Sequence, residues 1–135
     1  MTKEAKLREL QFKVLNYIVA TNHYLKKVKI KDTDLCDFCK QEKETVCHLF
    51  YECRFAVGFW KDFERYWEQK TAEPLRLIRK EIILGIPNLK ADLLNYCILL
   101  AKKFILNSKL NNIYPTFKHF HNALVEAYNI EKNIK

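Results

Sequence analysis

A chain of 135 residues, 49% of them hydrophobic, is long enough to bury one hydrophobic core. Its two glycines and three prolines supply little material for tight turns, which excludes most many-stranded folds and favours long helices. The formal charge of +8 is typical of proteins that bind polyanions, most often nucleic acid, although a solvated lysine-rich surface gives the same balance.

The first predicted helix covers about residues 3–20. Its apolar side chains recur at intervals of three and four, as in an amphipathic helix packed on a core: Leu7, Leu10, Val14 and Ile18. We expect residues 21–23 to end this helix. Lys13 lies on or near its polar side and is a candidate for contact with nucleic acid.

Residues 24–31 hold the most concentrated positive charge, four lysines within six residues: Lys26, Lys27, Lys29 and Lys31. Val28 and Ile30 alternate with lysines, which is the period of a strand, so we predict one short extended segment. The lysines either contact the phosphates of a nucleic acid or form a solvated edge that discourages strand pairing. The sequence leaves both interpretations open.

Three cysteines and one histidine follow in the pattern C-x2-C-x8-H-x4-C: Cys36, Cys39, His48 and Cys53. Zinc prefers four sulfur or nitrogen ligands in a tetrahedron, and a first pair two residues apart lets one tight turn present both sulfurs. We therefore predict a structural Cys3His zinc site in a knuckle-like loop, rather than four unrelated core residues. Residues 32–53 hold six acidic and two basic groups, so the flanking segments should bind phosphate.

A disulfide or a redox C-x-x-C is a weaker interpretation of these cysteines. The opening residues 1–6 do not resemble a signal peptide, so we expect a reducing intracellular compartment, nuclear or cytoplasmic, in which such clusters hold metal. A thioredoxin-type motif would require a βαβ context that the sequence does not offer.

Two details of the zinc loop follow from its geometry. Cys47 adjoins His48, and one tetrahedral ion cannot easily take both neighbours, so we assign Cys47 to packing. His48 and Cys53 would be rotated by about 140° on a regular helix. We therefore place His48 in a distorted first turn, with Thr45 as a candidate N-cap.

The rest of the chain predicts three further helices, which makes about four in all. An aromatic helix over residues 54–67 carries a stripe expected to be core rather than a base-stacking platform: Ala56, Phe59, Trp60, Phe63 and Trp67. Residues 82–86 are predicted to be a buried extended piece or loop. The apolar helix over about residues 91–107 is too short for a membrane span and is interrupted by Lys102 and Lys103. A last helix begins after Thr116.

Several stretches resemble the zinc-binding C-terminal domain of reverse transcriptases from LINE-type non-LTR retrotransposons: residues 7–13, 21–22, 35–39, 44–53 and 59–60. Residues 99–105 and 114–117 also resemble the chain ends of such elements, so the resemblance spans most of the chain. The most specific of them is the run Glu-Thr-x-x-His-Leu-Phe-x-x-Cys after a C-x2-C pair. The resemblance implies a module downstream of the polymerase domain in the same polyprotein, which helps to hold element RNA or target DNA. It also implies that zinc is held by Cys36, Cys39, His48 and Cys53.

We predict a non-catalytic, mostly α-helical domain over residues 1–135. Its parts are an N-terminal helix with the basic segment (1–31), the zinc loop with the aromatic helix (32–67) and the C-terminal helices (68–135). The paired aspartates of the polymerase are missing, and a Cys3His site leaves no coordination position open for water. Its expected partners are RNA or DNA and the polymerase domain, with no membrane. The alternative is a structural or protein-docking zinc domain that supports a polymerase without touching nucleic acid.

Overall fold

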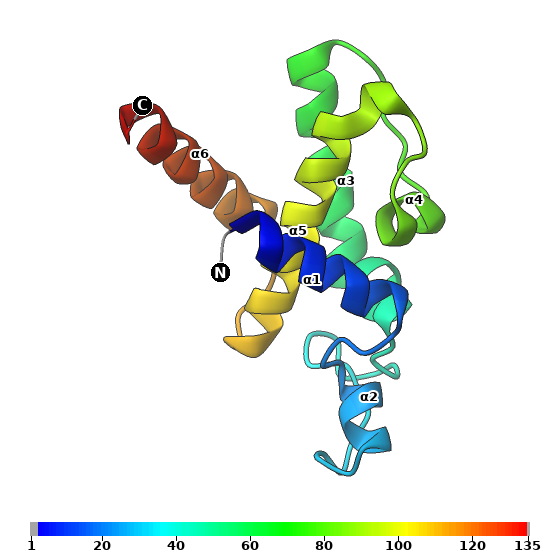
Figure 1. The fold of residues 1–135 in the computed structure, drawn as a ribbon. Coiled ribbons are helices and arrows are strands. Elements are labelled where there is room, and N and C mark those ends of the chain that lie inside the picture. Colours follow the sequence, from blue (N-terminus) through cyan, green and yellow to red (C-terminus); the bar gives the residue numbers. More distant parts are fainter. Residues whose placement is uncertain (1–2, 135) are drawn as a thin grey trace.

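A computed structural model describes the backbone of residues 3–134 and the side chains of residues 4–88 and 90–126 (Figure 1). The described chain is helical, and its β pairing is limited to one isolated bridge between Leu35 and Lys43. The prediction of a mostly α fold is confirmed. In chain order the elements are α1 (Lys3–Leu15), α2 (Asn22–Lys27), the π-helix η1 (His48–Glu52), α3 (Arg54–Thr71), α4 (Arg79–Leu84), the 3-10 helix η2 (Leu89–Ala91), α5 (Asp92–Leu110) and α6 (Phe117–Ile134).

The centre of the fold is the aromatic face of α3. Phe59 packs on Phe104 of α5 and on Phe120 of α6, with ring centroids 6.0 and 5.4 Å apart. Trp60 is buried and donates from Nε1 to the carbonyl oxygen of Phe50 at 2.6 Å, which fastens α3 to η1. The aromatic stripe is therefore core, as predicted.

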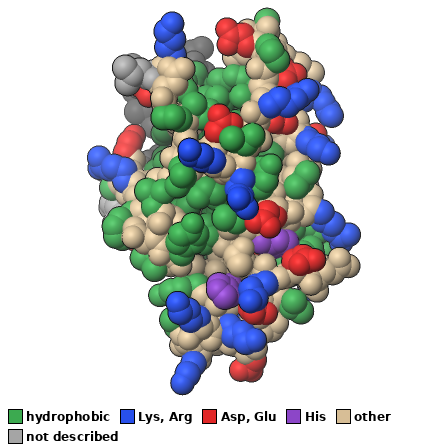
Figure 2. Space-filling view, turned by 90° about the vertical axis from the view of Figure 1, so that its right-hand side faces the viewer, with side chains coloured by type: hydrophobic (Ala, Val, Ile, Leu, Met, Phe, Trp, Pro, Cys, Tyr) green, Lys and Arg blue, Asp and Glu red, His purple; other side chains and the backbone are tan. Residues whose placement is uncertain are grey.

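The helices are arranged around α5 (Figure 1). Helix α1 crosses α5, and α2 with the loop that follows lies at one end of the molecule, well away from α6. Seen from the side of α4 (Figure 2), hydrophobic side chains gather across the middle of the surface, and basic side chains are frequent at the end that carries α2. None of the helices within residues 3–134 is long and apolar enough to cross a membrane.

Helix α1 ends at Leu15, five residues before the predicted end. Tyr17 adopts a left-handed conformation, with φ at 56°. The amide of Ile18 donates to the carbonyl of Lys13 at 3.0 Å and that of Tyr17 to Val14 at 3.2 Å, which is the Schellman pattern. The early turn buries Val19 and leaves Ile18 partly exposed, so the apolar period continued past the physical end of the helix.

The predicted extended segment over residues 24–31 is wrong. Thr21 is buried and caps α2, its Oγ1 accepting from the amide of Tyr24 at 3.3 Å. After α2 the chain turns at Lys29, where φ is 64°, and the amide of Ile30 returns to the carbonyl of Leu25 at 2.8 Å. The short alternation of apolar residues and lysines therefore belongs to a helix and its C-terminal turn.

The predicted extended piece at residues 82–86 is also corrected, because α4 includes its first part. The Glu81 carboxylate accepts from the amide of Ile78 at 3.1 Å and so caps the start of the helix. Ile82 and Ile83 are the buried residues of this helix. Gly85 ends the helix with φ at 93°, a conformation that favours glycine.

Helix α5 is the central helix that the sequence predicts, but it buries two lysines. Lys102 is 2% and Lys109 3% exposed. Lys109 meets two carboxylates, those of Asp37 and Glu44. Lys102 instead donates to two neutral oxygens, the side-chain oxygen of Gln11 at 2.6 Å and the carbonyl of Ile83 at 3.2 Å.

Replacing Lys102 with Met is expected to stabilise the fold at neutral pH. Burial lowers the pKa of Lys102 from 10.5 to about 8. At 1.36 kcal/mol per pKa unit, folding with the charged side chain costs about 3 kcal/mol at most. Between pH 8 and pH 10.5 the unfolded chain binds more protons than the folded chain, so the stability of the native protein rises with pH. The advantage of Lys102→Met is therefore full below pH 8 and lost above pH 10.5.

Urea unfolding at pH 7 and in the alkaline range measures this difference. Lys103→Met is the matched control, because Lys103 is adjacent but only half-buried. Lower stability of Lys102→Met than of the native protein at pH 7 would contradict the expectation.

Candidate metal centre

The first two cysteines lie in a tight turn closed by backbone hydrogen bonds. The amide of Phe38 donates to Cys36 Sγ at 3.3 Å, and the amide of Lys40 donates to the Cys36 carbonyl at 2.9 Å. Lys40 has φ at 59°, so the chain reverses directly after Cys39. The ends of the turn are joined because the Cys36 amide donates to the carbonyl of Glu42 at 2.8 Å. This arrangement turns both sulfurs to the same side.

His48 and Cys53 stand at the two ends of the π-helix η1. The amide of Cys53 donates to the carbonyl of His48 at 2.9 Å, an i to i+5 bond that adds a residue to the turn. The wider turn brings the two side chains to one side, which a regular α-helix would not do. Thr45 Oγ1 accepts from the His48 amide at 3.1 Å, so the predicted distorted turn and its N-cap are confirmed.

The turn and the π-helix bring four ligand atoms to within 4.8 Å of one another, from Cys36, Cys39, His48 and Cys53. All four side chains are buried. A zinc–sulfur bond of 2.3 Å gives tetrahedron edges of about 3.5–3.8 Å. Cys36 Sγ lies 3.8 Å from Cys53 Sγ, and Cys39 Sγ lies 3.4 Å from His48 Nε2. The donor set and its spacing fit zinc.

The cysteine thiols influence one another. The side-chain hydrogen bond between Cys36 and Cys53 raises the pKa of Cys36, which burial raises further, and lowers the pKa of Cys53. Zinc binds thiolates, so an ion held by these cysteines would take the place of the shared proton. Metal binding at this cluster therefore releases protons and weakens as the pH falls.

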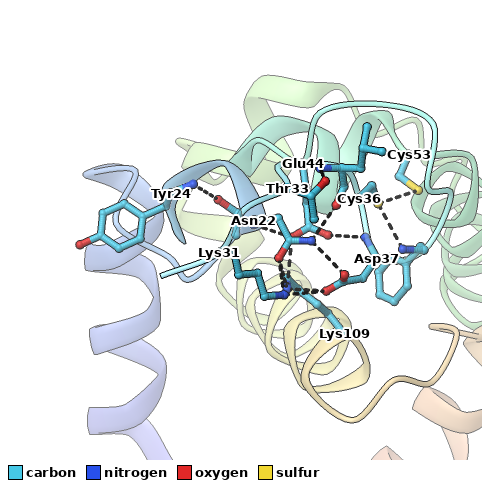
Figure 3. A network of polar contacts seen from close by, with 12 residues as sticks. Asn22, Tyr24, Lys31, Thr33, Cys36, Asp37, Glu44, Cys53 and Lys109 are labelled. Carbon is cyan, nitrogen blue, oxygen red and sulfur yellow. Dashed lines mark hydrogen bonds and ion pairs between the residues drawn. The ribbon is translucent and has the colours of Figure 1, made fainter. Parts of the chain in front are cut away.

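A buried polar network supports the turn that carries Cys36 and Cys39 (Figure 3). Glu44 is completely buried, and its carboxylate accepts from the backbone amides of Asn22 and Asp37 at 2.8 and 2.9 Å. Lys109 of α5 lies 3.2 Å from Glu44 and 2.7 Å from Asp37. Lys31 completes the network by donating to Asn22 Oδ1 at 2.8 Å.

The network fixes the segment that carries Cys36. Asn22 donates from Nδ2 to the carbonyl of Leu35 at 2.7 Å and to Asp37 Oδ1 at 2.9 Å, one residue to either side of that cysteine. Burial alone would raise the pKa of Asp37, but hydrogen bonds from Lys109 and Asn22 outweigh it and lower that pKa. Asp37 is therefore held as a carboxylate by α5 and α2 together.

This network has no recognisable signature in the sequence. Its members are polar residues of ordinary appearance, and Lys109 is 72 residues from Asp37 and 87 from Asn22. Lys109 lies beyond residue 107, where the apolar helix is predicted to end, so the apolar pattern assigns it no place in the core. Such a residue is exposed in most proteins unless a partner is provided.

The predicted nucleic-acid-binding lysines occupy two places. Lys26 and Lys27 end α2, and Lys29 and Lys31 follow in its C-terminal turn. Lys13 belongs to α1 instead. It lines a shallow depression between α1 and α5, together with Lys6 and Lys103. The structure thus groups four of the five predicted lysines.

The remaining cysteines lie outside the cluster. Cys47 is half-buried and packs against the core, in line with the packing role predicted for it. Cys97 packs in the same way on α5, and burial raises the pKa of its thiol.

Comparison with known proteins supports the assignment of this cluster as a zinc site. Residues 2–60 match the family described as zinc-binding in reverse transcriptase, a range that contains all four residues of the cluster. No curated protein and no solved structure shows a significant match to the chain. In sequence, residues 2–60 are therefore similar to the zinc-binding region of reverse transcriptases.

Proposed function

We propose that the chain is a zinc-stabilised nucleic-acid-binding module of a reverse transcriptase from a LINE-type non-LTR retrotransposon. Cys36, Cys39, His48 and Cys53 hold a structural zinc ion, and the module binds element RNA or target DNA without catalysing a reaction. The observation that carries the proposal is the position of the basic turn. Residues 26–31 are joined through Lys31 and Asn22 to the network behind the zinc loop.

The charges of this turn are available to phosphate to different degrees. Lys26 and Lys31 lie 3.9 and 3.8 Å from Asp34 and Asp37, which are long and weak ion pairs. Among the described residues, no carboxylate lies within 4.0 Å of the exposed Lys27 and Lys29. These two lysines are therefore the best placed for phosphate contact.

Lys13 and Lys31 are expected to contribute less. Lys13 is paired with Glu9 at 3.0 Å on the surface of α1. Lys31 is engaged with Asn22, so its replacement would disturb the zinc loop as well as the surface charge. A clean test of binding therefore changes Lys27 and Lys29.

The double variant Lys27→Glu/Lys29→Glu is expected to weaken binding to short RNA and DNA without unfolding the chain. Each phosphate contact adds about one unit to the slope of log affinity against log salt concentration. The variant should thus lose about two units of slope. Fluorescence anisotropy of the zinc-loaded chain across a salt series, with single-stranded and duplex oligonucleotides, measures it.

The matched control is Lys61→Glu/Lys80→Glu, which makes the same change in net charge at exposed lysines of α3 and α4. An equal loss in both double variants would show that only net charge matters. Negligible binding by the native chain at physiological salt would overturn the proposal and favour a protein-docking zinc domain.

A further inference from the structure

A cavity of about 250 Å³ lies between α1, α4 and α5. Its walls are largely apolar, and the polar side chains that line it are Gln11, Asn95 and Lys102. One wall is fixed by Asn95, which exchanges two hydrogen bonds with the backbone of Ile86 at 2.8 and 2.9 Å. The cavity is therefore a built feature of the fold, distant in sequence from the zinc loop.

The ammonium group of Lys102 is a buried cation without a counter-ion in the described structure. Its acceptors, Gln11 Oε1 and the carbonyl of Ile83, are both neutral. Gln11 also donates from Nε2 to the same carbonyl at 3.0 Å, so that oxygen is shared. An ammonium group has three donors, and these contacts use two of them. A buried charge of this kind is costly and is normally paired.

We propose that this cavity is a docking site for a partner polypeptide, which inserts an Asp or Glu carboxylate toward Lys102. A carboxylate would supply the missing charge and form a charge-assisted hydrogen bond. The cavity is smaller than the sites that enclose small molecules, about 300–1,000 Å³. Its size suits one side chain.

The rim of the cavity favours a polypeptide as the occupant. Leu84 lines the cavity and is 52% exposed, and Pro87 beside it is also exposed. Hydrophobic side chains gather on the face that carries α4 (Figure 2). We expect the inserted carboxylate to be flanked by apolar residues that cover this rim. This contact goes beyond nucleic-acid binding and uses none of the lysines of residues 26–31.

The test titrates the zinc-loaded, 15N-labelled full chain with acetyl-Leu-Glu-Leu-amide and with its Gln counterpart, followed by NMR. The Glu peptide should bind at least about tenfold more tightly, because only its side chain carries the charge. The shifted amides should include those of Gly85, Ile86 and Asn95. Equal binding of both peptides, or no binding of either, would overturn the proposal.

Variants and a third ligand sharpen the result. Lys102→Met should abolish the preference for Glu while Lys103→Met retains it. Leu84→Asp tests the same surface at an exposed position and should weaken the Glu peptide at least about tenfold by repulsion. Butanoate alone should bind much more weakly than the Glu peptide. If it binds as tightly, the cavity is a site for small acids and the docking proposal fails.

Discussion

Replacing Cys39 or His48 with Ala is expected to release zinc and to unfold the chain. Structural zinc contributes on the order of 10 kcal/mol to small domains, which is comparable to the whole stability of a protein of this size. The effect should reach beyond the loop, because Leu49 and Phe50 of η1 are completely buried and Trp60 is hydrogen-bonded to η1. Loss of the metal should thus loosen the contact between η1 and α3.

Zinc content by mass spectrometry and thermal unfolding by circular dichroism measure this prediction. Cys47→Ala is the matched control, because Cys47 adjoins His48 but lies outside the cluster. It should retain one zinc ion per chain and nearly the native melting temperature. Unchanged metal content and melting in Cys39→Ala or His48→Ala would end the zinc interpretation.

The zinc centre could be predicted from the sequence because its information is local. All four residues lie within eighteen positions, and few other chemistries use three thiols and one imidazole at such spacing. The conflict between the spacing of His48 and Cys53 and a regular helix predicted a distortion. Its form, an i to i+5 hydrogen bond, depends on the packing of η1 beneath α3 and was not readable from the residues alone.

The predictions of secondary structure that were wrong concern short elements. A two-residue period over residues 27–31 is a weaker signal than the Thr21 cap and the turn at Lys29, which fix the backbone directly. The long aromatic and apolar helices were predicted because their periods extend over several turns. The two buried lysines had no local signal, since Lys102 finds Gln11 across 91 residues and Lys109 finds Asp37 across 72.

Replacing Lys109 with Met should destabilise the chain by about 3–5 kcal/mol, the usual cost of breaking a buried ion pair from one side. The variant leaves the Glu44 carboxylate, which is completely buried, with only the backbone amides of Asn22 and Asp37 as donors. This outcome is opposite in sign to that of Lys102→Met on the same helix. The difference arises because Lys109 faces two carboxylates and Lys102 faces none among the described residues.

The same change should weaken zinc binding about 10–100-fold, the usual effect of removing groups that position metal ligands. Lys109 holds Asp37, and Asp37 directly follows Cys36, so the turn that presents that sulfur loses one of its supports. Urea unfolding and competition with a chromophoric chelator measure the two effects. Lys103→Met, which changes a half-buried lysine of the same helix, should alter neither by more than experimental error. A loss below about 1 kcal/mol in Lys109→Met with native zinc affinity would show that Asn22 and Glu44 hold the loop without α5.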